Sequence, residues 1–179
     1  MGRPLSEDFK DMTAPIAISG VAVEPGPNLG VSLQVALPLS TLDNEVFVVT
    51  GVDLDPDVAD FLSGQACFTD ASLSTTNRNV AGLVTAGTLA DGSVVASAQN
   101  YTQVSGGTTC AVSSRREDPT TTPIGQEYLA IIATDDFFAN VVGTNNNNAK
   151  GVRFRLYGFR AKVKNPAVYA ALVQSELLS

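Results

Sequence analysis

The stretch Gly151-Val-Arg-Phe-Arg-Leu-Tyr-Gly-Phe-Arg-Ala-Lys-Val-Lys164 says most about the fold of this chain. In its first half, Val152, Phe154 and Leu156 alternate with other residues, which is typical of one face of a β-strand. After Tyr157-Gly158 the apolar set continues one position out of phase. This slip predicts a β-bulge with glycine at the bulged position, at a positive φ angle that other residues rarely adopt. With such a bulge, five basic residues would share the face opposite the apolar one: Arg153, Arg155, Arg160, Lys162 and Lys164.

Charge is distributed unevenly along the 179 residues, whose formal net charge is −7. Between Phe137 and Ser175 there is no Asp or Glu, but this segment holds Lys150 and the five basic residues of the strand. The other 5 basic residues and all 18 acidic ones lie outside it, so the rest of the chain carries −13. The basic face is either a solvated strand face or a patch that attracts the acidic body of another copy. We expect it to be an assembly contact, and charge reversal at Arg153 and Arg155 to impair assembly.

Composition indicates a single all-β domain. The chain is 44% hydrophobic and only 16% charged, with no His and no Trp, and Gly, Thr, Ser, Val and Asn are frequent. Acidic, Lys-poor composition is typical of proteins from high-salt environments, where screening weakens repulsion between like charges. We divide the chain into an N-terminal arm (1–14), a β-sandwich (15–165) and a C-terminal helix or tail (166–179).

Alternating apolar residues bounded by turn signals predict an antiparallel β-sandwich of the single jelly-roll type, with short connecting helices and a short C-terminal helix. The predicted strands are 16–23, 29–37, 45–52, 79–89, 92–104, 127–133 and 151–164, with weaker ones at 66–69 and 108–114. Segment 127–133 is apolar on both sides, which favours a central, covered strand. We expect a helical turn within 134–142, and a helix at 167–178 capped by Asn165 that docks through Val168, Ala171, Leu172 and Leu178.

Two smaller patterns each have two interpretations. The spacing of Asp53, Asp55 and Asp57 resembles a calcium loop, which makes these residues weak candidates for a metal site. The loop lacks the required Gly and Glu, so we favour a helix N-terminus in which Asp55 is the cap and the helix ends near residue 64. Cys67 and Cys110, the only cysteines, could form one disulfide, but their apolar neighbours favour buried free thiols.

The C-terminal third resembles the single jelly-roll major capsid proteins of membrane-containing icosahedral viruses that infect halophilic archaea. The resemblance rests on the size, the acidic composition and five segments: Tyr128-Leu-Ala-Ile-Ile132, Asp136-Phe-Phe138, the loop 145–148, the strand 154–163 and Tyr169-Ala-Ala-Leu172. It implies a coat subunit of a virion that assembles into capsomers with copies of itself and other capsid proteins. An internal viral membrane is a further implied partner.

Other functions remain as alternatives or are disfavoured by the sequence. The alternatives are a capsid decoration or spike protein, and a carbohydrate-binding β-sandwich, although a sugar binder would need exposed aromatic residues. We expect no enzyme and no cofactor, since there is no His, no Gly-x-Ser-x-Gly motif and no phosphate-binding loop. We expect no direct nucleic-acid binding either, because a remainder carrying −13 repels phosphate.

Overall fold

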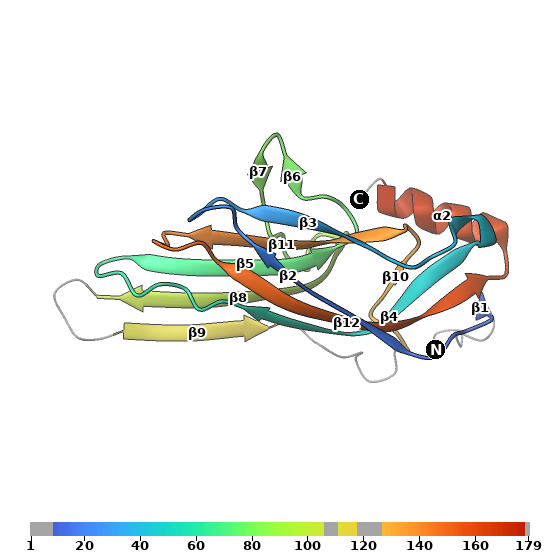
Figure 1. Cartoon of the computed structure of the whole chain (residues 1–179), viewed down its shortest axis with the longest axis horizontal. Helices are drawn as coiled ribbons and strands as arrows, with labels where there is room; N and C mark the ends of the chain where they lie inside the picture. Colours follow the sequence, from blue (N-terminus) through green and yellow to red (C-terminus); the bar gives the residue numbers. More distant parts are fainter. Residues whose placement is uncertain (1–8, 106–110, 118–126, 178–179) are drawn as a thin grey trace.

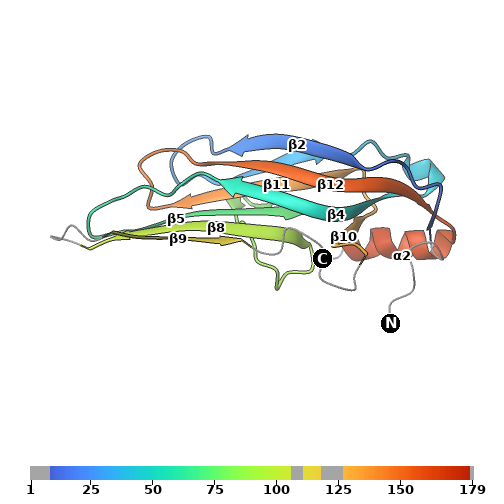
Figure 2. The same ribbon diagram turned by 90° about the horizontal axis from the view of Figure 1, so that it is seen from below.

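The computed structural model describes residues 9–105, 111–117 and 127–177. Two antiparallel sheets stack face to face, and the chain's strands run along the long axis of the molecule (Figures 1 and 2). The strands are β1 Phe9–Lys10, β2 Ile16–Val23, β3 Val31–Ala36, β4 Glu45–Pro56, β5 Ala66–Ser74, β6 Asn79–Val80, β7 Leu83–Val84, β8 Val94–Val104, β9 Ala111–Glu117, β10 Ala130–Ile132, β11 Asp136–Thr144 and β12 Gly151–Val163. The described helices are the short 3₁₀ turn η1 Thr41–Asp43 and the C-terminal helix α2 Pro166–Leu177.

The strand order confirms the predicted jelly roll. The first sheet has the order β2-β12-β4-β10, with β1 beside β2 on β12, and the second has the order β3-β11-β5-β8-β9. The pairs are nested: β2 pairs with β12, β3 with β11, β4 with β10 and β5 with β8. The chain is therefore one long hairpin whose two arms are wound into a sandwich, the arrangement that defines a jelly roll.

The main core lies between the two sheets, and burial of apolar side chains in it accounts for the strands that were predicted correctly. Its largest fully buried side chains include Phe47, Leu73, Ile132, Phe137 and Leu156. The alternation read in 16–23, 29–37 and 92–104 is confirmed by β2, β3 and β8, with boundaries that differ by up to two residues. Each of these strands places alternate apolar residues toward the core, so hydrophobic burial and strand geometry agree.

The chain from 45 to 79 contains more strand than predicted. β4 continues to Pro56, so the predicted helix N-terminus at Asp55 is wrong. Leu54 and Pro56 are buried while Asp53 and Asp55 are exposed, which is strand alternation. β5 likewise runs from Ala66 through Ser74, beyond the weak strand predicted at 66–69. Its second half alternates Ala71 and Leu73 of the main core with Ser72 and Ser74, which are turn-favouring residues that the fold nevertheless buries.

Three predictions in the middle of the chain are also corrected. Segment 79–89 is not one strand: β6 and β7 form a short hairpin that projects from the sandwich (Figure 1). Segment 127–133 shrinks to β10, which pairs only with β4 among the described residues and so lies at a sheet edge. The expected helical turn at 134–142 is strand β11, because Phe137, Ala139 and Val141 point into the main core and β11 pairs on both sides.

The bulge is confirmed in position, but the bulged strand is β4. Tyr157 faces Gly51 and Gly158 faces Val49, so Thr50 is the extra residue. Gly158 is not at positive φ. It is glycine because a Cβ there would lie 2.2 Å from the carbonyl oxygen of Val48 and 2.5 Å from the Phe47 ring. Close approach of the neighbouring strand explains this glycine, not backbone strain.

A second core cluster fixes the helix to the end of the sandwich where β10 lies (Figures 1 and 2). Asn165 caps α2 as predicted, because its Oδ1 accepts a hydrogen bond from the Ala167 N–H at 2.9 Å. Of the predicted docking stripe, Leu172 packs on the cluster, together with Tyr169 and Val173. Val168 and Ala171 are exposed instead, and Leu178 lies outside the described residues.

Part of the N-terminal arm is tied to the body, as is the helix. β1 pairs with the end of β12, where Phe9 faces Val163, and both belong to the second core cluster. The Thr13 N–H donates to the carbonyl oxygen of Arg160 at 2.9 Å. These contacts confirm, for the described residues, that both terminal segments pack on the body of the domain. Residues 1–8 of the arm lie outside the described range.

Candidate functional site

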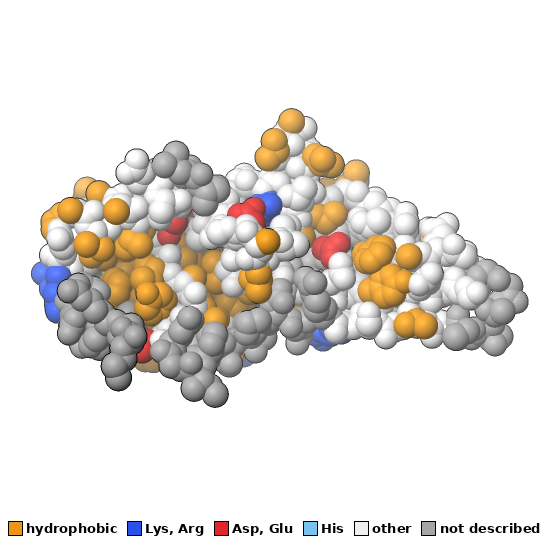
Figure 3. All heavy atoms as spheres, turned by 180° about the vertical axis from the view of Figure 1, so that it is seen from behind, with side chains coloured by type: hydrophobic (Ala, Val, Ile, Leu, Met, Phe, Trp, Pro, Cys, Tyr) orange, Lys and Arg blue, Asp and Glu red, His pale blue; other side chains and the backbone are white. Residues whose placement is uncertain are grey.

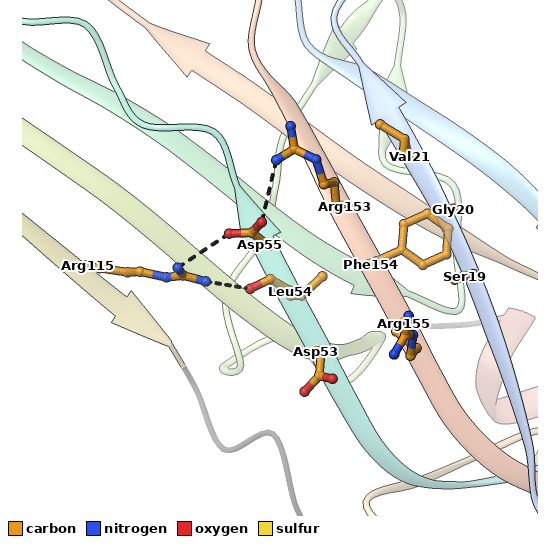
Figure 4. A pocket seen from close by; sticks show the side chains of 10 residues that line it. All are labelled: Ser19, Gly20, Val21, Asp53, Leu54, Asp55, Arg115, Arg153, Phe154 and Arg155. Atoms are coloured by element: carbon orange, nitrogen blue, oxygen red, sulfur yellow. Dashed lines mark hydrogen bonds and ion pairs between the residues drawn. The ribbon is translucent and has the colours of Figure 1, made fainter.

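A shallow groove of about 500 Å³ crosses the outer face of the first sheet. β12 and β4 form its floor, β2 one wall, and Arg115 of β9 reaches over from the second sheet (Figure 4). Charged side chains from three strands converge here. We call four of them, Asp53, Asp55, Arg153 and Arg155, the charged ladder.

The charged ladder results from cross-strand register. Arg153 stands opposite Asp55, and Arg155 stands opposite Asp53. Arg153 Nη1 lies 3.5 Å from Asp55 Oδ2 and 3.2 Å from Asp57 Oδ1. The Tyr157 hydroxyl donates to Asp53 Oδ2 at 2.9 Å. The basic strand therefore meets acidic partners within its own fold.

These pairs contribute little to stability, because they are solvated. The side chains of Arg153 and Asp55 are 63% and 56% exposed. Exposed pairs of this kind contribute about 0–1 kcal/mol each, and salt screens them. The charged ladder therefore balances positive and negative charge on this sheet face, and it contributes little to the stability of the fold.

Arg115 bridges the two sheets at their open side. Its Nη2 donates to the carbonyl oxygen of Leu54 at 3.0 Å, and its Nη1 lies 3.4 Å from Asp55 Oδ1. On the side of β4 away from β12, the described strand β10 pairs only with residues 47–49. The Leu54 carbonyl therefore lies on an open strand edge, and Arg115 supplies its hydrogen bond. Arg115 lies on strand β9, which continues past the weak strand predicted at 108–114.

The expectation that the five basic residues share one face is wrong. Arg153 and Arg155 face outward, but Arg160 stands opposite Phe47, a residue of the main core, and its Nη1 donates to the Pro38 carbonyl at 3.0 Å. Lys162 stands opposite Glu45 on one side and Lys10 on the other. The extra residue of the bulge belongs to β4, so the side chains of β12 keep alternating without a slip.

The apolar phase of β12 changes because its surroundings change. Before the bulge, Phe154 and Leu156 contact the main core. After it, Phe159, Ala161 and Val163 contact the second core cluster on the opposite face, where α2 covers the sheet. Of the five predicted assembly residues, the structure thus gathers Arg153 and Arg155 and separates Arg160 and Lys162 from them. Lys164 follows the end of β12.

The weak metal candidates Asp53, Asp55 and Asp57 lie at alternate positions at the end of β4 and just after it. Their carboxylates contact Tyr157, Arg115 and Arg153, and Asp57 Oδ2 also accepts a hydrogen bond from the Gly151 N–H at 2.9 Å. Within residues 9–105, 111–117 and 127–177, no group of three His, Cys, Asp or Glu side chains is arranged to hold a metal ion.

Sequence reasoning missed a buried polar cluster around the loop 145–148. Lys150 is 6% exposed, and its Nζ donates to Asp60 Oδ1 and, at 2.9 Å, to the carbonyl oxygen of Val58. Burial raises the pKa of Asp60, but hydrogen bonds from Lys150 and from the N–H groups of Asn147 and Asn148 outweigh it, so this pKa lies below its ordinary value. No local signal links residues 90 positions apart.

The same cluster uses a buried carboxylate as a structural link. Glu24 is 4% exposed and accepts hydrogen bonds from the N–H groups of Gly143 at 2.6 Å and Lys150 at 2.9 Å. Cys67 is a buried free thiol that donates to the Asn145 carbonyl at 3.0 Å, and Cys110 lies outside the described residues. The loop 145–148 is therefore held by hydrogen bonds from several parts of the chain.

The edge of the first sheet is formed by an apolar strand, β2. β2 has the sequence Ile16-Ala-Ile-Ser-Gly-Val-Ala-Val23, without a charge or a proline. Among the described strands it pairs only with β12, so its other edge is open. Val21 and Val23 are 55% and 56% exposed. Such an edge is a template for pairing with another strand.

No known protein family matches the chain, and no curated protein sequence matches it. No helix in the described residues is long and apolar enough to cross a membrane. The function is therefore inferred from the fold and its surface.

Proposed function

We propose that the protein is a virion structural protein, a coat subunit that self-assembles into the capsomers of an icosahedral shell. The double-sheet jelly roll is an architecture of viral capsid and lectin domains, which narrows the classes to consider. The resemblance of the C-terminal third to capsid proteins of halophilic archaeal viruses supports the coat subunit. Its site of action would be the capsid, with other copies and other capsid proteins as partners and an internal viral membrane as a further one.

The observation that carries this proposal is the unprotected edge of β2. Proteins that remain monomeric protect such edges with lysines, prolines, bulges or a covering segment. β2 is eight residues long, and none of its side chains is charged. Antiparallel pairing of β2 with β2 of a second copy about a two-fold axis would continue the first sheet across two subunits.

At high salt, an interface made of backbone and apolar contacts is more stable than one made of ion pairs. Screening at high ionic strength weakens attraction between exposed charges, whereas salting-out ions strengthen apolar burial. Arg153 and Arg155 lie on the sheet face next to β2, where Ser19 and Val21 line the same groove. In this proposal they set the register of neighbouring subunits, and apolar and backbone contacts supply most of the assembly energy.

The test is the assembly state of the purified full-length chain at low and high salt, measured by analytical ultracentrifugation and electron microscopy. We expect the wild type to form oligomers or shells, and the double variant Ser19→Lys/Val21→Lys to remain a folded monomer, because edge lysines oppose strand pairing. The matched control is Leu83→Lys on β7, where Leu83 is 71% exposed and pairs with Val80 of β6, outside the first sheet; it should assemble like the wild type.

Two outcomes contradict the proposal: a wild type that stays monomeric at every salt and protein concentration, and an edge variant that assembles like the wild type. The variant Arg153→Glu/Arg155→Glu distinguishes the contribution of the basic side chains to assembly from that of the β2 edge. If it assembles normally across the salt range, the basic side chains have no role in assembly and the β2 edge alone carries it.

A further inference from the structure

The outer face of the second sheet carries an aromatic pair that the sequence does not reveal. Phe68 of β5 and Tyr101 of β8 stand opposite each other, with ring centroids 5.0 Å apart and planes tilted by 41°. Their neighbours in the same row are Thr144 of β11 and Ser114 of β9, both exposed. We call these four residues the aromatic row. Figure 3 views this face and shows hydrophobic side chains gathered toward its narrow end beside an acidic one.

The next row toward the middle of the sheet contains Val142, Asp70 and Gln99, and we call it the polar row after the last two. The Gln99 Nε2 donates to Asp70 Oδ1 at 2.5 Å. Both polar side chains are half-buried. A carboxylate and an amide held in one pair present acceptors and donors in a fixed geometry, which suits neighbouring hydroxyl groups of a ligand.

The segment 75–93 closes the groove on its other side. It packs over the third row, where the outward side chains Ser72 and Asn140 are fully buried, and Ser72 donates to the Ala86 carbonyl. Between this segment and the polar row lies a groove of about 360 Å³, lined by Asp70, Gln99 and Val142 of the sheet and by Thr85, Gly87 and Thr88 of the segment.

The covering segment is fixed by Arg78. Arg78 Nη1 lies 2.6 Å from Asp91 Oδ2 and donates to Ser93 Oγ at 3.2 Å, while its Nε donates to the Thr85 carbonyl at 3.2 Å. Gly87, at a φ of 73°, leaves the space that the guanidinium occupies. The wall of the groove is therefore held in place before any ligand binds, which reduces the entropy cost of binding.

We propose that this groove binds a neutral saccharide. Pyranose rings carry apolar C–H faces that stack on aromatic rings, and hydroxyl edges that bind paired carboxylate and amide groups. The aromatic row supplies the first surface, and the Asp70–Gln99 pair with the hydroxyls of Thr85 and Thr88 supplies the second. The Asp70 carboxylate and the Gln99 amide oxygen accept hydrogen bonds from such hydroxyl groups, and the Gln99 amide nitrogen donates to them. The volume is within the range of small-ligand sites.

This site goes beyond the coat function, since it lies on the sheet opposite to β2 and its groove shares no residue with the β2 edge. A coat subunit with such a groove would attach to glycans outside the particle or retain them on its surface. The proposal stands or falls independently of assembly, because binding can be measured on the monomeric edge variant as well as on the wild type.

The experiment is titration of the full-length chain with neutral malto-, cello- and manno-oligosaccharides, followed by nuclear magnetic resonance shifts and calorimetry. We expect at least one series to bind with shifts confined to the aromatic row and the polar row. Tyr101→Ala and Asp70→Asn should each weaken binding about tenfold or more, as for other residues at the centre of a contact. The control Tyr128→Ala removes a tyrosine that is 37% exposed beside β10, and should leave binding within about twofold, as expected for a residue outside the contact.

Absence of binding for all three series at millimolar sugar would overturn the proposal. So would binding that Tyr101→Ala and Asp70→Asn leave unchanged, or shifts that map to the first sheet. Because Tyr101 is half-buried, its variant is checked for folding by amide spectra. Tyr101→Phe, which keeps the ring, should retain most of the affinity and distinguishes loss of stacking from loss of structure.

Discussion

Gly158→Ala is the sharpest test of how β12 and β4 fit together. The added Cβ would lie 2.2 Å from the Val48 carbonyl oxygen and 2.5 Å from Cε1 of Phe47, where ordinary contacts are at least 3.4 Å. The oxygen belongs to the backbone of a paired strand, and Phe47 is fully buried, so neither can move without disturbing the bulge or the main core.

The magnitude follows from two opposing effects. Overpacking of a tight core costs about 1–3 kcal/mol, and a clash with backbone belongs at the upper end of that range. Replacing glycine by alanine restores about 0.4–1 kcal/mol by restricting the unfolded chain. The free energy of unfolding should therefore fall by about 2 kcal/mol. For a domain of this size that lowers the Tm by roughly 4–8 °C.

The assay is urea and thermal unfolding followed by circular dichroism, with Gly92→Ala as the matched control. A Cβ on Gly92 meets nothing within 4 Å, and its φ is not in the left-handed region, so this variant should be neutral or slightly stabilised. If Gly158→Ala unfolds at the same temperature as the wild type or as Gly92→Ala, the close approach of β4 at the bulge is refuted. Phe47→Leu should not rescue the variant, since the carbonyl contact remains.

Two further predictions concern pH. The N–H of Ser93 and the guanidinium of Arg78 lower the pKa of Asp91 from 3.8 to about 2, so its contribution is present above pH 3.8 and is lost as the pH falls toward 2. Because its side chain is 35% exposed, Asp91→Asn should cost only about 1 kcal/mol at neutral pH, and urea unfolding curves of variant and wild type should converge near pH 2. Burial raises the pKa of Glu176 above its ordinary 4.5, against hydrogen bonds from Ala133 and Thr134. The contribution of Glu176 to stability is fully present below pH 4.5 and is lost as the pH rises through the raised pKa. Over this pH interval the free energy of unfolding of Glu176→Gln should therefore fall less than that of the wild type. Equal slopes of the two free energies against pH would contradict this prediction.

The sequence by itself determined the fold class and the elements with clear alternation. In β2, β3 and β8 one face is apolar, so the period of two is visible without knowing the neighbours. The cap of α2 at Asn165 was also local, because a capping side chain lies within a few residues of the N–H group that it binds. These features need no long-range information.

The tertiary structure alone decided which faces are covered. β11 is buried on both sides over most of its length, so its period disappears and it reads as a helical turn. In the second half of β5, Ser72 and Ser74 read as a loop because serine favours turns, although the fold buries both side chains. The apolar phase of β12 changes because the main core covers one face of its first half and the second core cluster covers the other face of its second half. The extra residue of the bulge belongs to β4 and leaves the alternation of β12 intact. A single strand cannot show which of its faces a helix elsewhere in the chain will cover.

The candidate sites depended on register between distant strands. The charged ladder, the Lys150–Asp60 pair and the Phe68–Tyr101 pair each join residues 30 or more positions apart in the sequence. The sequence showed that basic and acidic residues are segregated, but the nested pairing of the jelly roll brings β12 beside β4 and opposes the charges. Basic and acidic residues that are far apart along the chain thus contact each other in the fold, because strand topology decides which residues are cross-strand neighbours.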